Sequence, residues 1–160
     1  MTDVISDGKT RVAIALSLAN INAPTVAECT AAQDITPRLT PDGLKLDPTT
    51  ADVDTSSLAS TFDTKEVGRV GYDTELTFKR GTTTQEDWPY QNLVYGVHCY
   101  VIVRRAVDYA TAWAAGQQVE VYPVVCGERA NVSPAANEVM KFVSPIKVYA
   151  APATNALVAA

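Results

Sequence analysis

Hydrophobic and polar side chains alternate with a period of two along much of this chain, which is the spacing of a half-buried β-strand. The clearest example is the segment 70–79. One of its faces carries Val70, Tyr72, Leu76 and Phe78, and the other carries Asp73, Glu75, Thr77 and Lys79. We therefore expect a strand here with one face against a core and the other in water.

Further segments have the composition of strands. Residues 97–103 are apolar on both faces apart from His98, which is typical of a strand covered from both sides. The remaining candidates are 12–19, 119–126 and 139–149. Proline has no N–H to donate to a ladder, so Pro123 and Pro145 predict edge or bulge positions in the last two.

Helical periodicity is weak throughout the chain, and the predicted fold class is mainly β. Two short helices are plausible, over 25–32 after Pro24 and over 84–95. Thr84 can cap the second, and the acidic residues that follow favour the positive end of the helix dipole.

The segment 47–64 is unusual because it consists mostly of Thr, Ser, Asp and Ala, with Val53, Leu58 and Phe62 as its only larger apolar residues. Unstructured connections longer than about 12–15 residues are uncommon inside compact domains and are usually functional or disordered. Residues 1–10 and 150–160 have the same deficit, and we expect them to be terminal arms.

The composition of the chain excludes several classes of function. A chain of 160 residues with 47% hydrophobic content fits one folded domain, 1–160, and no apolar run is long enough for a membrane anchor. The formal net charge of −5 argues against a broad basic surface for nucleic acid. One histidine and three scattered cysteines leave little material for a metal cage or a catalytic triad. We expect structure or binding rather than enzymatic activity.

The remaining motifs point to no chemistry. Asp52, Asp54, Ser56 and Asp63 have the offsets of a calcium loop, but the turn glycine and the chelating glutamate are missing, so a solvated acidic loop is expected. The odd, widely spaced cysteines indicate folding in a reducing cytoplasm. We expect no catalytic, cofactor-binding or metal-ligating residue.

The order of these features resembles the major tail tube proteins of long-tailed, non-contractile bacteriophages, the siphophages. The resemblance covers essentially the whole chain. It is carried by Glu66-Val67-Gly68-Arg69-Val70-Gly71-Tyr72-Asp73-Thr74-Glu75-Leu76, the acidic-aromatic stretch 85–90, the strand 97–105, and residues 119–127 and 137–142.

The resemblance implies a two-sheet β-sandwich or barrel with one flanking α-helix, a long inter-strand loop and extended termini. In that family six subunits close a ring, and rings stack into a hollow tube in the virion tail, assembled in the host bacterial cytoplasm. The implied partners are further copies of the chain and the tail tape-measure and tail terminator proteins. The family has no catalytic residue to carry over.

The long loop of the family would lie over 47–66 and bridge neighbouring subunits. Its contacts would order a segment that has no core of its own. The residues predicted for this inter-subunit loop are Asp47, Asp52, Asp54, Leu58 and Phe62.

An acidic tube wall would repel DNA, which would then pass through without specific binding, whereas a basic lumen would hold the duplex by counterion release. Asp73 and Glu75, on the wet face of the strand 70–79, are the lumen-facing residues we expect.

A monomeric β-sandwich module for binding, adhesion or virion decoration is the alternative. It predicts a stable monomer with a concave aromatic patch, whereas the tube predicts concentration-dependent rings or filaments. A hydrolase fits poorly, because no two of the 18 carboxylates are recognisably placed for paired acid and base work.

Overall fold

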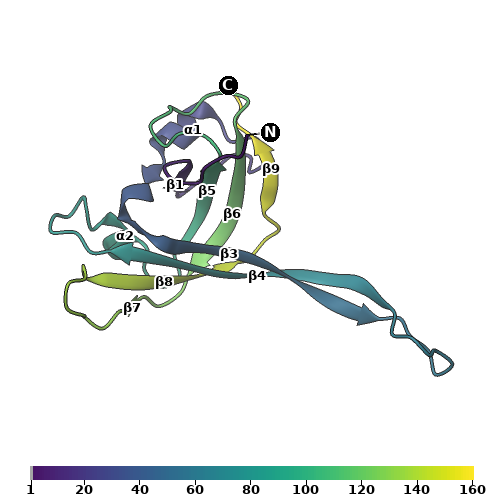
Figure 1. Ribbon diagram of the computed structural model, residues 1–160. Helices are drawn as coiled ribbons and strands as arrows, with labels where there is room; N and C mark the ends of the chain where they lie inside the picture. The colour runs from purple at the N-terminus through teal and green to yellow at the C-terminus, as the bar shows by residue number, and fades with distance from the viewer. Residues whose placement is uncertain (1) are drawn as a thin grey trace.

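The computed structural model describes residues 2–160 and is mainly β, as predicted (Figure 1). Two short helices, α1 (Val26–Ala31) and α2 (Trp88–Asn92), and a 3-10 turn at Thr36–Arg38 accompany the strands. The strands are β1 (Thr10–Ala15), β2 (Gln33–Asp34), β3 (Leu39–Asp54), β4 (Lys65–Lys79), β5 (His98–Arg105), β6 (Gln118–Cys126), β7 (Ala130–Asn131), β8 (Lys141–Val148) and β9 (Ala153–Leu157).

All strands belong to one antiparallel sheet with the order β2-β1-β5-β6-β8-β4-β3, and β7 and β9 are added to β8 and β6. The expected two layers are two parts of this sheet: β5 and β6 run upright in Figure 1, while β3, β4 and β8 cross beneath them. β8 belongs to both parts, because Lys141–Pro145 pairs with β4 and Ile146–Val148 pairs with β6. The path ends at β2 and β3, so the sheet does not close into a barrel.

The main core fills the space between the two parts of the sheet. Leu76 and Phe78 of β4 pack there with Val101 and Val103 of β5, all fully buried. A second cluster on the other face of β5 and β6 includes Trp113. β5 is therefore covered from both sides, as its apolar pattern predicts.

The two strand prolines lie where strands change partners. On one side of β6, pairing with β9 ends at Val121 and pairing with β8 begins at Val124, and Pro123 lies between them. Pro145 is the last residue of β8 paired with β4, and the next residue pairs with β6. A residue without an N–H fits where one side of the ladder is interrupted. The prolines therefore lie at local gaps in the pairing of interior strands, and not at the bulges or edge strands that the sequence predicted.

The first helix is confirmed within its expected range, 25–32. Thr25 caps α1 by accepting from the backbone N–H of Glu28, whose carboxylate accepts from the backbone N–H of Thr25. The second helix is shorter than the expected 84–95 and begins only at Trp88. The chain before it forms turns, and Asp87 accepts two hydrogen bonds from Arg80.

Two expected irregular segments form strands instead. β3 continues to Asp54 and β4 begins at Lys65, so the loop expected over 47–66 is confined to residues 55–64. Paired Thr and Val residues favour the extended ladder although no core covers them. In the expected C-terminal arm 150–160, β9 pairs with β6 and buries Ala153 and Ala156 in the second core cluster.

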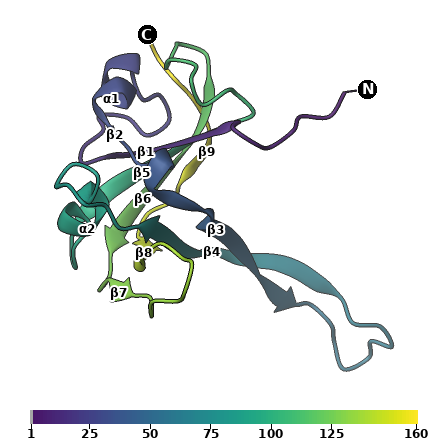
Figure 2. The ribbon, with the colours of Figure 1, turned by 60° about the vertical axis from the view of Figure 1, so that its left-hand side comes forward.

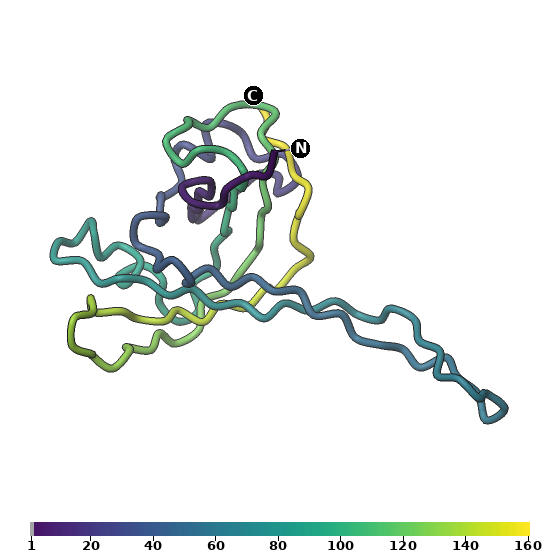
Figure 3. The backbone as a smooth tube through the Cα atoms, viewed as in Figure 1, coloured from purple at the N-terminus to yellow at the C-terminus, as the bar shows by residue number. Residues whose placement is uncertain are grey.

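The molecule consists of a compact body and a long projection (Figures 2 and 3). The projection is the outer part of the β3–β4 hairpin. The described part of the expected N-terminal arm 1–10 is residues 2–10; residues 2–8 form no strand and are exposed, whereas Thr10 already begins β1. Residue 1 lies outside the described residues. Among residues 2–160, no helix has the length and apolar content needed to cross a bilayer.

Candidate assembly surfaces

The hairpin arm, defined here as residues 47–72, is the first candidate surface. Its strands pair only with each other, because β8 pairs with β4 no further out than Glu75. Every side chain from Asp47 to Asp54 is exposed. An isolated two-stranded hairpin is marginally stable in water, so this arm lacks the packing that normally holds such an element.

The register gives the arm two different faces. The inner face continues the core side of β3 and β4 through the pairs Pro48–Tyr72, Thr50–Val70 and Asp52–Val67. The outer face carries the pairs Asp47–Asp73, Thr49–Gly71 and Val53–Glu66. Val67 and Val70 are 80% and 58% exposed, so the inner face presents apolar surface to solvent.

A bulge separates the base of the arm from its outer part. Thr50 pairs with Val70 and Asp52 pairs with Val67, which leaves one extra residue on β4. A Cβ atom on Gly68 would lie 2.9 Å from the carbonyl oxygen of Ala51. The close approach of the two backbones therefore depends on glycine at this position.

The tip of the arm carries Leu58 and Phe62, two of the residues predicted for an inter-subunit loop. Leu58 is fully exposed and Phe62 is 79% exposed. The turn is closed by hydrogen bonds from the Thr55 N–H to the Thr64 carbonyl, at 3.0 Å, and from the Ser60 N–H to the Ser57 carbonyl, at 2.9 Å. The two apolar side chains are thus held outward on an ordered turn.

The three acidic residues predicted for the inter-subunit loop have different neighbours in the arm. Asp52 forms an exposed ion pair with Lys65, at 2.8 Å. The Ser56 hydroxyl and backbone N–H lower the pKa of Asp54 by hydrogen bonding to its carboxylate. Asp47 lies directly opposite Asp73 in the ladder.

Asp73 and Glu75 lie together on the exposed side of β4, beyond the core. Lys45 donates to Asp73 at 2.7 Å, and this hydrogen bond with the accompanying charge lowers the pKa of Asp73. Lys147 of β8 lowers it further. The carboxylates are therefore interspersed with lysines, and this side of the sheet carries both signs of charge.

A cluster of two arginines around Tyr90 of α2 was not predicted from the sequence. The Tyr90 ring lies between two guanidinium groups, with the Cζ atoms of Arg80 and Arg129 at 3.4 and 3.8 Å from its centroid. Arg80 also donates two hydrogen bonds to Asp87, at 2.9 and 2.8 Å. Burial alone would raise the pKa of Asp87, but hydrogen bonds from Arg80 and the Gly81 N–H outweigh it and lower that pKa.

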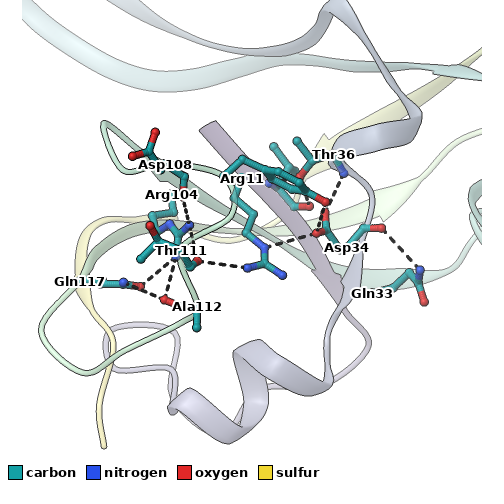
Figure 4. Close-up of polar contacts among 11 residues, drawn as sticks. Arg11, Gln33, Asp34, Thr36, Arg104, Asp108, Thr111, Ala112 and Gln117 are labelled. Carbon is teal, nitrogen blue, oxygen red and sulfur yellow. Dashed lines mark hydrogen bonds and ion pairs between the residues drawn. The ribbon is translucent and has the colours of Figure 1, made fainter. Parts of the chain in front are cut away.

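A second arginine cluster fastens the loop 106–117 to the body (Figure 4). Arg104 is fully buried and donates to the carbonyls of Asp108, Thr111 and Ala112 and to the side-chain oxygen of Gln117. Arg11 lies beside it, with its Nε 3.3 Å from a carboxylate oxygen of Asp34. Both guanidinium groups lie over the Trp113 ring.

Both clusters make hydrogen bonds within the chain that hold loops in place. Within residues 2–160, no group of three or more His, Cys, Asp or Glu side chains is arranged to hold a metal ion. All three cysteines are buried, and burial raises the pKa of the Cys29 thiol to about 11. The hairpin arm, by contrast, leaves large apolar side chains exposed to solvent.

Comparison with family models and with solved structures finds similar proteins. A family model described as phage tail tube protein matches residues 1–160. A chain in the structure titled "Cryo-EM structure of the anti-feeding prophage (AFP) baseplate, 6-fold symmetrised" is similar in fold, with a TM-score of 0.53 at 11% identity, over 92% of this chain and 93% of that one. No match was found among curated proteins.

Proposed function

This chain belongs to the phage tail tube protein family, and on that premise we propose that it self-assembles into stacked rings of six copies. The rings form a conduit for DNA ejection in the tail of the virion, and no enzymatic step is part of this proposal. Assembly takes place in the host bacterial cytoplasm, and the tape-measure and terminator proteins of the tail are the further partners.

The observation that carries the proposal is the exposed apolar surface of the hairpin arm. Leu58 and Phe62 at the tip, and Val67 and Val70 on the inner face, are each more than half exposed. Burying such a side chain contributes about 1.5–3 kcal/mol. An arm that keeps these residues in water gains this energy when a second copy covers them.

The shape of the molecule suits head-to-tail association. The arm projects from one side of the body only, so a contact between the arm and a neighbour's body joins two different surfaces (Figure 2). Such heterologous contacts close into rings when the rotation per subunit divides the circle. The long free edge of β3, at the end of the sheet path, is available for the same joint.

We assign the lumen to the exposed side of β3, β4 and β8, with Asp73 and Glu75. The amphipathic register supports this assignment, because covering the apolar inner face of the arm leaves the polar outer face in water. Lys45 and Lys147 dilute the negative charge locally, so repulsion of DNA comes from the net charge of −5 on each copy.

The test is assembly as a function of protein concentration, measured by sedimentation velocity and negative-stain microscopy. The wild type should form rings or hollow rods, and Leu58→Asp with Phe62→Asp should shift the protein toward monomers. Thr84→Asp is the control, because it adds a charge at an exposed polar position on the body. Monodisperse monomers at all concentrations would favour the alternative, a β-sandwich module for binding or decoration.

A further inference from the structure

A groove opens where β8 leaves β4. The two strands pair from Glu75–Pro145 to Lys79–Lys141, and beyond Pro145 β8 turns toward β6 (Figure 1). β4 instead continues outward into the arm, so the strands diverge. The groove between them, called the wedge here, has a volume of about 480 Å³ and is lined by Val70–Tyr72 on one side and Val148–Pro152 on the other.

One wall of the wedge is an unpaired strand edge. Within residues 2–160, β4 outward of Glu75 pairs with β3 on one side and with no strand on the side of β8. Its backbone N–H and C=O groups are therefore free to accept an added strand. None of the lining residues is charged and most are apolar, so the wedge offers an added strand both backbone hydrogen-bonding groups and apolar side chains to pack against.

The N-terminal segment has the matching properties. Residues 2–7 lie outside the strands and helices, and within the described chain residues 2–5 make no backbone hydrogen bond. Val4 and Ile5 are nonetheless 65% and 73% exposed. This is an extended segment with two adjacent large apolar side chains and a backbone without partners.

Basic side chains border the wedge, and one of them, Lys147, also lies near Asp73. Asp3 and Asp7 flank the two apolar residues of the segment. Arg69 directly precedes the groove-lining part of β4, and Lys147 directly precedes that of β8. Both basic side chains are exposed.

The segment cannot reach the wedge of its own chain. The Gly8 carbonyl accepts from the Tyr109 N–H, which fixes Gly8 near the end of β5 that carries Arg105. From there Val4 extends at most about 14 Å. The wedge lies near the other end, where Tyr149 donates to Pro123 opposite Tyr100, and the stretch from Tyr100 to Arg105 alone spans about 17 Å.

We propose that residues 2–7 of one copy add as a β-strand to the free edge of β4 in a second copy, with an apolar side chain seated in the wedge. This inference rests on the proposed self-assembly and adds a second contact between copies, besides the contact made by the tip of the arm. The donated strand covers Val70 on the inner face of the arm and thereby stiffens the arm at its base.

Intermolecular cysteine cross-linking tests the joint. Tagged Val70→Cys protein is mixed with untagged Val4→Cys or Ile5→Cys protein under assembly conditions and mildly oxidised. Successive side chains of a strand point to opposite faces, so one of the two N-terminal variants should form mixed dimers efficiently and the other should not. Leu16→Cys, exposed on the body, is the control, and the native cysteines are too buried to compete.

Other occupants give different results. A cross-link of Val70→Cys to Thr50→Cys, in place of the N-terminal variants, would show that a neighbour's arm fills the edge and would overturn the proposal. A cross-link confined within single chains of a Val70→Cys/Ile5→Cys double variant would also overturn it, and so would the absence of any cross-link in assembled rods.

A second measurement separates this inference from the proposed function. Val4→Asp with Ile5→Asp should raise the protein concentration required for half-assembly at least about tenfold, equivalent to a loss of about 1.4 kcal/mol. If the wild type and this variant assemble equally well, the donated strand is wrong and the tail tube function stands. If the wild type never assembles, both fail.

Discussion

At the residue scale, Arg104 shows how a charged side chain can organise a loop from inside the body. Its position after an apolar strand, next to Arg105, suggests two surface charges and pairing with carboxylates. Arg105 does pair with Glu120, at 3.2 Å. The side chain of Arg104 points to the opposite face of β5, where its hydrogen-bond acceptors are backbone carbonyls of the loop 106–117 and not a carboxylate. The sequence could not reveal this, because the acceptors come from the fold of the loop.

Replacing Arg104 with Met should therefore be costly. The substitution leaves several buried acceptors without donors, and each such loss costs about 1–3 kcal/mol. We expect the free energy of unfolding to fall by about 3 kcal/mol or more, measured by urea denaturation. Arg105→Met, which removes an exposed ion pair, should change it by less than about 1 kcal/mol. Equal effects would contradict the role assigned to Arg104.

Asp87 should make stability depend on acidic pH. Its pKa in the folded protein lies below the ordinary value of 3.8. The resulting stabilisation is fully present above that ordinary value and is lost as the pH falls through the lower, folded value. Asp87→Asn should cost about 2 kcal/mol at pH 7, because it breaks charged hydrogen bonds from Arg80.

The same comparison at lower pH is the check on that prediction. The difference in unfolding free energy between wild type and Asp87→Asn should shrink toward pH 2. Asp73→Asn, at an exposed ion pair, should cost less than about 1 kcal/mol at either pH. A constant difference for Asp87→Asn across the acid range would mean that the carboxylate charge is not what matters.

At the element scale, the apolar patterns of the sequence predicted β1, β4, β5, β6 and β8, and α1 was expected after Pro24, whereas β2, β7, β9 and the body part of β3 were not predicted. These patterns did not reveal that 47–54 is a strand, because a strand without a core has no apolar face to mark it. The sequence also did not predict which residues of the arm share a face, because this depends on the register that pairs Thr50 with Val70. The N-terminal segment was expected as an arm, but the wedge arises only where β8 and β4 diverge.

The close approach of the two backbones at the bulge can be tested by adding a single methyl group at Gly68. Gly68→Ala would place a Cβ against the Ala51 backbone, whereas Gly71→Ala would meet only the Thr49 hydroxyl, at 3.4 Å. We expect Gly68→Ala to speed amide hydrogen exchange in 47–54 and 65–72 at least about tenfold, the effect of about 1.4 kcal/mol. Exchange in β5 should not change, and Gly71→Ala is the matched control. Similar exchange in both variants would contradict the close approach.

At the scale of the whole molecule, folding and assembly are assigned to different parts of the chain. The two core clusters, which hold the body together, are built without the outer arm: no residue between Asp47 and Gly71 belongs to either. The apolar surface of the arm and of residues 2–7 remains in water. The body should therefore be able to fold without the arm, and the arm should need another copy.

Deleting the outer arm should separate these two properties. Joining Pro48 to Tyr72 through an Asn-Gly turn keeps the innermost pair of the arm and removes its tip. We expect a folded monomer whose thermal midpoint lies within about 4 °C of the wild type, a shift of about 1 kcal/mol, with no rings at any concentration. Rods formed by the shortened chain would show that the arm is dispensable for assembly.

The central claim is that a neighbouring copy covers the hairpin arm, and the most direct measurement is a cryo-electron microscopy reconstruction of the concentrated wild-type protein. The account predicts hollow rods in which Leu58, Phe62 and Val67 of each copy lie against the next copy and Asp73 faces the bore. A reconstruction with these apolar side chains in solvent, or particles that remain single at every concentration, would contradict it.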